Sequence, residues 1–228
     1  MLISIIHHDN YTKEGVFLDR LDFIYNRHSV RKFKDQDIPM EDIRQIIRAA
    51  TYAPSGKNSQ NWHFVVIRNK EKLQQMAEVI QKKNAELAQQ LQDEEKQKSF
   101  MKFSRFATFF KDAPVVIAVY AGPYMPTGLD VLKEIGASQK EIEDLRRPNP
   151  GIQNIGAAIE NLLLAASALG YGGCWMTSPN YAAKEISDCI GFHKEGYYYV
   201  AMVPLGIPEG EIKSPPRKDI EEVMTVIE

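Results

Sequence analysis

Cysteine is scarce in this sequence: the chain has only Cys174 and Cys189, and they do not form a CxxC pair. Their number and spacing argue against a disulfide framework, a zinc knuckle and an iron–sulfur motif. Long apolar runs are missing too, since no segment approaches the ~20 residues of a membrane-spanning helix. The apolar run at residues 2–6 is too short for a signal sequence. We therefore expect a soluble, cytoplasmic protein with no metal site and no membrane partner.

A surplus of one charge sign is also missing, because 28 lysines and arginines face 30 aspartates and glutamates. This balance creates no overall field that would attract nucleic acid, so any anion site must be local. The GxGxxG, GxxxxGK[ST], HExxH and GxSxG motifs are absent as well. Without a recognisable nucleophile, metal set or acid–base pair, an enzyme built from this chain would take its chemistry from a bound cofactor.

The apolar pattern predicts strands and helices that are interleaved without strict βαβ alternation. Strands are expected at 62–67, 115–120, 172–177 and 197–206. Helices are expected up to about Arg27, around the apolar positions 43–50, and over 69–99, 155–170 and about 182–190. We find no internal repeat and no linker that divides the chain. This order predicts a single α+β domain over residues 1–228.

Two regions leave more than one interpretation open. Residues 69–99 form an amphipathic helix by their apolar stripe, and phenylalanines follow at steps of three, at positions 100, 103, 106 and 109. Such a stripe is either core or an apolar wall over a ligand pocket. Residues 122–151 are rich in proline and glycine and predict an irregular excursion with one short helical piece. Long excursions of this kind are often lids or binding loops.

The segment RHSVRKF, residues 27–33, concentrates positive charge in a slightly acidic chain. Cations near the end of a helix are favourable by about 0.3–1 kcal/mol, which accounts for Arg27 and His28. It does not account for Ser29 and Arg31. In an extended chain, residues 27, 29 and 31 share one face, and two guanidiniums around a hydroxyl suit a phosphate. From this segment alone, an anion site and a solvated turn remain equally open.

Three further segments are ambiguous when each is taken alone. APSGKNSQNWHF, residues 53–64, is a polar loop that ends a helix and begins a strand. GYGGCWMTSP, residues 170–179, has glycines that let the backbone approach a ligand closely. PPRK, residues 215–218, carries Arg217 behind two prolines.

Together and in this order, the four segments resemble the FMN-dependent nitroreductase family from about residue 20 to residue 220. RHSVRKF is similar to the family pattern R-[RH]-S-x-[RK]-x-F, and APSGKNSQNWHF is similar to A-P-S-x-x-N-x-Q-P-W-x-F. NIGAAIENLLLAASALGYGGCWM resembles its central helix and the strand that follows, and VPLGIPEGEIKSPPRK its closing strand and basic segment. The resemblance implies a nitroreductase-like fold, with a central, mostly antiparallel sheet flanked by helices, in an intertwined homodimer.

The resemblance also implies a binding site for tightly held FMN. The phosphate and ribityl contacts would fall on Arg27, His28, Ser29 and Arg217, and Arg31 would reach the N1/C2 side of the ring. The other subunit would line the flavin with Pro54, Ser55, Gly56 and Asn58. The backbone of Met176, Thr177 and Ser178 would face flavin N5. No catalytic side chain is implied, because flavin N5 would carry the chemistry.

The activity implied is a ping-pong reaction in which NAD(P)H reduces FMN, which then reduces a nitroaromatic, a quinone or a similar small molecule. A specialised flavin enzyme of the same fold (a dehalogenase, an enoate reductase or a flavin-fragmenting enzyme) and a non-catalytic flavin-binding protein are the alternatives. Regions 69–112 and 122–151 would form a variable, substrate-facing lid, and residues 1–17 an N-terminal extension of unassigned role. The chain departs from the family pattern at Lys57, at Asn61, where proline is usual, and at Asn154, where an acidic residue is common.

Overall fold

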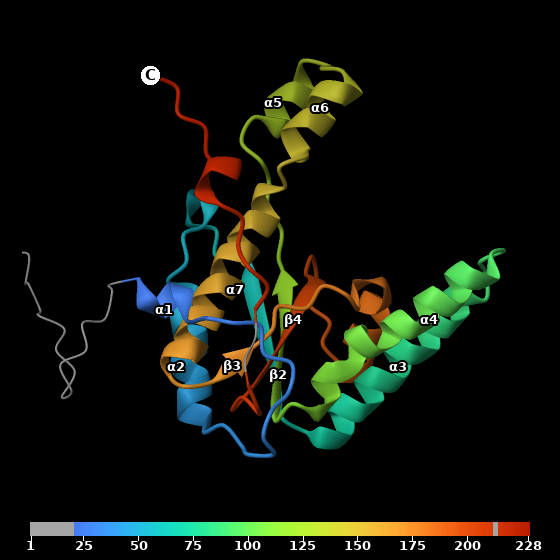
Figure 1. Ribbon diagram of the computed structural model, residues 1–228. Coiled ribbons are helices and arrows are strands. Elements are labelled where there is room, and N and C mark those ends of the chain that lie inside the picture. Colours follow the sequence, from blue (N-terminus) through green and yellow to red (C-terminus); the bar gives the residue numbers. More distant parts are fainter. Residues whose placement is uncertain (1–20, 212–213) are drawn as a thin grey trace, which may run out of the picture.

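The computed structural model describes residues 21–211 and 214–228 (Figure 1). The N-terminal extension expected at 1–17 lies outside the described residues. A four-stranded antiparallel sheet forms the centre, with strand order β1-β2-β4-β3. Its strands are β1 (Trp62–Ile67), β2 (Val115–Ala121), β3 (Gly172–Gly173) and β4 (Tyr198–Gly206). This sheet and the helices around it confirm the predicted α+β class.

The third strand is much shorter than the prediction of 172–177. Cys174 still donates its amide to the carbonyl of Pro204 at 3.3 Å. Proline has no amide to return, so the regular ladder stops opposite Pro204. Only an isolated bridge between Met176 and Met202 continues the pairing. The interruption comes from the partner strand, which the local pattern of residues 172–177 does not reveal.

Each face of the sheet packs against its own helices, as the two sides of Figure 1 show. Helices α2 (Met40–Thr51) and α7 (Pro150–Ala168) cover the face to which Val115, Ile117 and Val119 point. Helices α3 (Lys70–Ala88) and α8 (Ala183–Ile190) cover the face of Val116, Ala118 and Tyr120. The strict alternation along β2 therefore supplies both halves of the core. α2 and α8 confirm their predictions, whereas α7 begins five residues earlier than predicted.

The prediction of one helix over residues 69–99 is wrong. The chain breaks after α3 and starts again as α4 (Glu94–Thr108), followed by the 3₁₀ turn η2 (Phe109–Asp112). The Asp93 carboxylate caps α4 by accepting from the amides of Glu95 and Lys96. Such a cap stabilises the start of a new helix, which explains the break. α3 and α4 form a hairpin that projects from the body (Figure 1).

The excursion, residues 122–151, holds two helices and not the single short piece predicted. These are α5 (Leu129–Glu134) and α6 (Gln139–Arg146), and Ser138 forms a capping box with Glu141 at the start of α6. Figure 1 shows both helices beyond the N-terminal end of α7, away from the sheet. Three-residue 3₁₀ turns occur at η1 (Gly56–Asn58), η3 (Asn180–Ala182) and η4 (Ile220–Glu222).

The first described helix, α1 (Asp22–Tyr25), is one turn long and is capped at Asn26. It ends two residues before Arg27, so residues 27–33 are not helical. Within the described ranges, no helix combines the length and apolarity that crossing a bilayer would require.

Candidate active site

The basic segment, residues 27–33, lies beside β3. Ser29 forms a parallel bridge with Gly173, and the Val30 amide donates to the Gly173 carbonyl at 2.9 Å. A Cβ at Gly172 would lie only 2.4 Å from Val30 Cγ2, so glycine is required for this approach. The glycines at the start of β3 therefore bring the two predicted site segments together.

Arg27, Ser29 and Arg31 all influence the pKa of one buried thiol, that of Cys174. Burial raises the pKa of this thiol; the charge of Arg31, a hydrogen bond with the Ser29 side chain and the charge of Arg27 oppose the rise. That these three side chains share one face of the extended segment stays a prediction.

The Arg27 guanidinium is held against α7. Its Nε lies 3.5 Å from Glu160 Oε1, and the side chain is only 17% exposed. Within the described part of the chain, this contact leaves both terminal nitrogens without an ion pair or hydrogen bond. The group is thus oriented in advance, with donors left for an anion.

The C-terminal segment reaches the basic segment through His28. His28 Nδ1 lies 2.7 Å from the Ser214 hydroxyl oxygen. Arg217 follows three positions later on an exposed stretch. The four predicted phosphate and ribityl contacts, Arg27, His28, Ser29 and Arg217, thus belong to two chain segments that are joined by a hydrogen bond.

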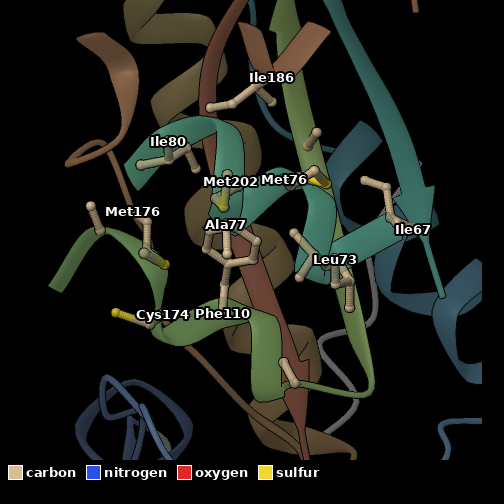
Figure 2. Close-up of a cluster of buried hydrophobic side chains, with 14 of the residues drawn as sticks. Ile67, Leu73, Met76, Ala77, Ile80, Phe110, Cys174, Met176, Ile186 and Met202 are labelled. Atoms are coloured by element: carbon tan, nitrogen blue, oxygen red, sulfur yellow. The ribbon is translucent and has the colours of Figure 1, made fainter. Parts of the chain in front are cut away.

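Residues 174–178 continue from β3 past this cluster. Cys174 and Met176 belong to the buried cluster drawn in Figure 2, while Trp175 and Thr177 are exposed. Met176 exchanges both backbone hydrogen bonds with Met202, so its amide is committed to the sheet. Among the described residues, the amides of Thr177 and Ser178 have no acceptor. Of the three predicted backbone contacts to flavin N5, only these two have a free donor.

The polar loop, residues 54–60, lies at the N-terminal end of α7, where Asn154 is. Gly56 donates its amide to Asn154 Oδ1 at 3.0 Å, and Lys57 Nζ donates to the Met125 carbonyl at 3.2 Å. In the described chain, the loop makes no hydrogen bond or ion pair with the basic segment. The structure therefore joins the basic segment to β3 and, through His28, to the C-terminal segment, whereas Pro54, Ser55, Gly56 and Asn58 make no such contact with it in the described chain. A contribution of this loop to a partner's site stays a prediction.

The phenylalanine stripe has an unexpected orientation. Phe110, one position beyond it, is fully buried, but Phe103 is 41% and Phe106 64% exposed, so the core interpretation is wrong for these two. They line a pocket of about 600 Å³ along α4, together with Phe100 and the lysines at 96 and 102. The Ser178 hydroxyl donates to the Phe106 carbonyl at 3.4 Å, which connects this pocket to residues 176–178.

Sequence reasoning missed two contributors to this geometry. The sequence marks Cys174 only as a residue of a predicted strand outside any CxxC pair, although the charges of Arg31 and Arg27 act on its thiol. Tyr124 carried no motif, yet a Cβ at Gly56 would lie 2.4 Å from its hydroxyl oxygen. Neither contact has a local signal in the sequence, because each joins distant segments.

The donor set fits a phosphorylated ligand such as FMN. Two guanidiniums, a hydroxyl and an imidazole lie on one short segment, and Arg217 is close in the chain to the bridging Ser214. These are the groups that bind a phosphate dianion with charge-assisted hydrogen bonds. A carboxylate at this cluster, that of Glu160, is paired with Arg27. No trio of histidine, cysteine or acidic side chains in the described ranges is arranged to hold a metal ion.

Comparisons with known proteins identify the family and the fold. The family model described as "Nitroreductase family" matches residues 24–207. A BluB-like flavoprotein from Clostridium difficile 630 is 45% identical, with a TM-score of 0.89, over 92% of this chain and 100% of that one. A nitroreductase with bound FMN from Desulfitobacterium hafniense DCB-2 is 26% identical, with a TM-score of 0.66, over 91% of this chain and 97% of that one.

A curated relative carries a different name. The iodotyrosine deiodinase of Hydra vulgaris is 27% identical over 229 residues, which cover 96% of this chain and 77% of that protein. The similarity thus extends over nearly the whole chain, to proteins whose names describe different reactions.

Proposed function

The chain belongs to the nitroreductase family, and on that premise we propose that it is an FMN-dependent oxidoreductase that uses NAD(P)H to reduce a small-molecule acceptor. The observation that carries this proposal is the Arg27 guanidinium, which Glu160 holds with its terminal nitrogens free, on a segment that Ser29 joins to β3. Bound FMN would supply two-electron transfer between NAD(P)H and the acceptor, a nitroaromatic, a quinone or a similar compound. The FMN seen in a neighbour of the same fold supports the choice of cofactor.

The side chains of this protein would bind and orient the cofactor. Arg27, fixed by Glu160, and Ser29 would hold the phosphate together with Arg217, and His28 would keep the C-terminal segment in place. Arg31 would stabilise negative charge on the N1 side of the ring. The free amides of Thr177 and Ser178 would donate to the edge that includes N5. No side chain is needed as a general acid or base.

A homodimer would complete this site with the polar loop of the second chain. Large apolar side chains stay exposed on α1 and along the C-terminal segment, which supports this assembly. They are Phe23, Ile24, Tyr25, Ile220, Val223, Met224, Val226 and Ile227. A cytoplasmic location is part of the same proposal and accords with two free cysteines.

The absorption spectrum of the purified protein tests the proposal. We expect a yellow protein, or one that takes up FMN, whose flavin bands are bleached by NADH or NADPH without air. Failure to bind FMN would refute the proposed function. A protein that binds FMN but is not bleached would be a flavin-binding protein without this activity.

A specialised flavin enzyme is the second candidate, and the 45% identity to a BluB-like flavoprotein favours it. Similarity to an iodotyrosine deiodinase points the same way. A panel of nitroaromatic, quinone, enone and iodotyrosine acceptors would separate the candidates. Turnover of only the halogenated compound would indicate a dehalogenase. Loss of flavin itself during aerobic turnover would indicate a flavin-fragmenting enzyme.

A further inference from the structure

We propose that the side-chain amides of Asn61 and Asn154 position the polar loop for the flavin. They also tie this loop to both stems of the excursion, that is, to the two ends of residues 122–151. The inference rests on the proposed function, since it gives these two residues a role in the same site. Neither asparagine belongs to the predicted flavin contacts. Both residues are departures from the family pattern, and the structure brings them into direct contact.

The two amides form one buried hydrogen-bonded pair. Asn154 lies in α7 and is 6% exposed; Asn61 precedes β1 and is 4% exposed. Asn154 Nδ2 donates to Asn61 Oδ1 at 2.8 Å and to Ser59 Oγ at 3.1 Å, while its Oδ1 accepts the Gly56 amide at 3.0 Å. A carboxylate at position 154 could not donate to Asn61, and the side chain of a proline at position 61 could not accept. The two residues are therefore chemically matched.

The same pair holds both stems of the excursion. Asn61 Nδ2 donates to the Gly122 carbonyl at 3.3 Å and to the Gly151 carbonyl at 3.1 Å. Gly122 directly follows β2, and Gly151 is the second residue of α7. One side chain thus joins the two points at which the arm carrying α5 and α6 leaves the body. The Asn61 carbonyl adds a further bond by accepting the Gly122 amide at 2.6 Å.

Tyr124 strengthens the link between the loop and the arm. A Cβ at Gly56 would lie 2.4 Å from Tyr124 Oη, and a Cβ at Gly151 would lie 2.8 Å from Tyr124 Cβ. The ring thus fits closely between two glycines, one on the loop and one on the stem. The bond from Lys57 Nζ to the Met125 carbonyl joins the same two segments. The loop cannot move far without disturbing the arm.

Backbone strain is concentrated in this region. The described chain has four non-glycine residues with positive φ, and all four lie on the loop or beside it at the start of α7. They are Lys57, Asn58, Gln60 and Asn149. Such conformations persist only where the surrounding contacts over-determine them. The buried amides supply those contacts, so removal of Asn154 should release the loop into lower-energy conformations.

The experiment compares Asn154→Ala, Asn154→Asp and Asn61→Ala with Asn161→Ala. Asn161 lies on the same helix but bonds to the Ala49 carbonyl, away from the loop, and serves as the matched control. Hydrogen exchange of the FMN-free proteins is one readout, and FMN affinity by fluorescence quenching is the other. In Asn154→Ala we expect faster exchange in residues 55–60 and 122–126 together, and at least about tenfold weaker FMN binding. Asn161→Ala should change neither.

Asn154→Asp separates positioning from a merely structural role. Aspartate can still accept from Gly56, but when ionised it cannot donate to Asn61. Protonation restores a donor, and burial raises the pKa of an aspartate, so its defect in FMN affinity should shrink as the pH falls towards about 5. The FMN affinity of Asn161→Ala should show no such recovery relative to the wild type. If Asn154→Ala does not fold, Asn154→Asp and Asn61→Ala carry the test.

The two hypotheses fail in different ways. If the wild type takes up no FMN, the proposed function is refuted, while coupled exchange in the FMN-free proteins still tests the tie between loop and arm. If the wild type binds FMN and both Asn154 variants bind it equally tightly, the positioning role is overturned and the proposed function stands. Faster exchange confined to the loop, without the stems, overturns the tie to the arm.

Discussion

His28 Nδ1 lies 2.7 Å from the hydroxyl oxygen of Ser214, although 186 positions separate the two residues. The contact joins the basic segment, residues 27–33, to the C-terminal segment that carries Arg217. A phosphate bound by Arg27 and Ser29 would therefore have a second arginine, Arg217, within a short stretch of chain. The bond also explains how an exposed C-terminal segment can be kept close to the site.

Replacement of Arg217 by alanine should weaken FMN binding. A charge-assisted hydrogen bond contributes about 1.5–3 kcal/mol, so the dissociation constant should rise roughly 10- to 100-fold. Titration of apoprotein into FMN with flavin fluorescence as the signal measures this. Ser214→Ala, which removes only the partner of His28, should give a smaller loss.

Lys218→Ala is the matched control, because it removes a neighbouring charge. Equal losses in Arg217→Ala and Lys218→Ala would mean that general charge attracts FMN, without a specific contact. Unchanged affinity in Arg217→Ala would show that the C-terminal contact is misassigned.

Phe106 and Phe110 should respond in opposite ways to truncation. Phe110 is fully buried, so Phe110→Ala should lower the free energy of unfolding by about 3–5 kcal/mol. Phe106 is 64% exposed and lines the pocket along α4, so Phe106→Ala should leave stability nearly unchanged and raise the KM of the acceptor. Urea denaturation and steady-state kinetics measure the two effects. A large loss of stability in Phe106→Ala would show that another surface covers this face.

Much of the fold could be predicted because its signals are local. The runs WHFVVI and VVIAVY predict β1 and β2 within a residue, and Ala182 to Ile190 predicts α8. In each case, the residues that determine the conformation are neighbours in the chain.

What could not be predicted depends on distant residues. The shortened β3 follows from Pro204 on the partner strand, and the exposure of Phe103 and Phe106 follows from how α4 lies on α3. Asn61 and Asn154 are 93 positions apart, and no local pattern reveals that they form a pair. The break before α4 is different, because Asp93 is a cap signal that the sequence did contain.

Tyr171 should make stability depend on pH in the alkaline range. Its hydroxyl donates to Asp42 Oδ2, and this bond, with burial and the charge of Asp42, raises the pKa of Tyr171 to about 12. The ordinary value is about 10. A raised pKa in the folded state means that the stabilisation is complete below about pH 10 and is lost between about 10 and 12.

Tyr171→Phe should therefore lower the free energy of unfolding by about 1 kcal/mol at pH 7, since the site is partly exposed. The difference from the wild type should shrink above about pH 10, where the other tyrosines titrate equally in both proteins. Urea denaturation at pH 7, 9 and 10.5 measures it. A difference that stays constant over this range would show that the bond to Asp42 does not persist in solution.

Gly56→Ala should disturb the polar loop through Tyr124, and Tyr124→Phe should relieve the disturbance. The added Cβ would lie 2.4 Å from Tyr124 Oη but 3.2 and 3.3 Å from the nearest ring carbons. Removal of the hydroxyl thus removes the severe clash and leaves contacts that a small shift can accommodate.

Gly56→Ala alone should weaken FMN binding, because the loop must move away from Asn154 Oδ1 and lose the Gly56 hydrogen bond. The double variant should recover most of that affinity, as FMN titrations of the two single variants and the double variant would show. If the double variant binds FMN no better than Gly56→Ala, the defect arises from the backbone of the loop and not from its packing against Tyr124.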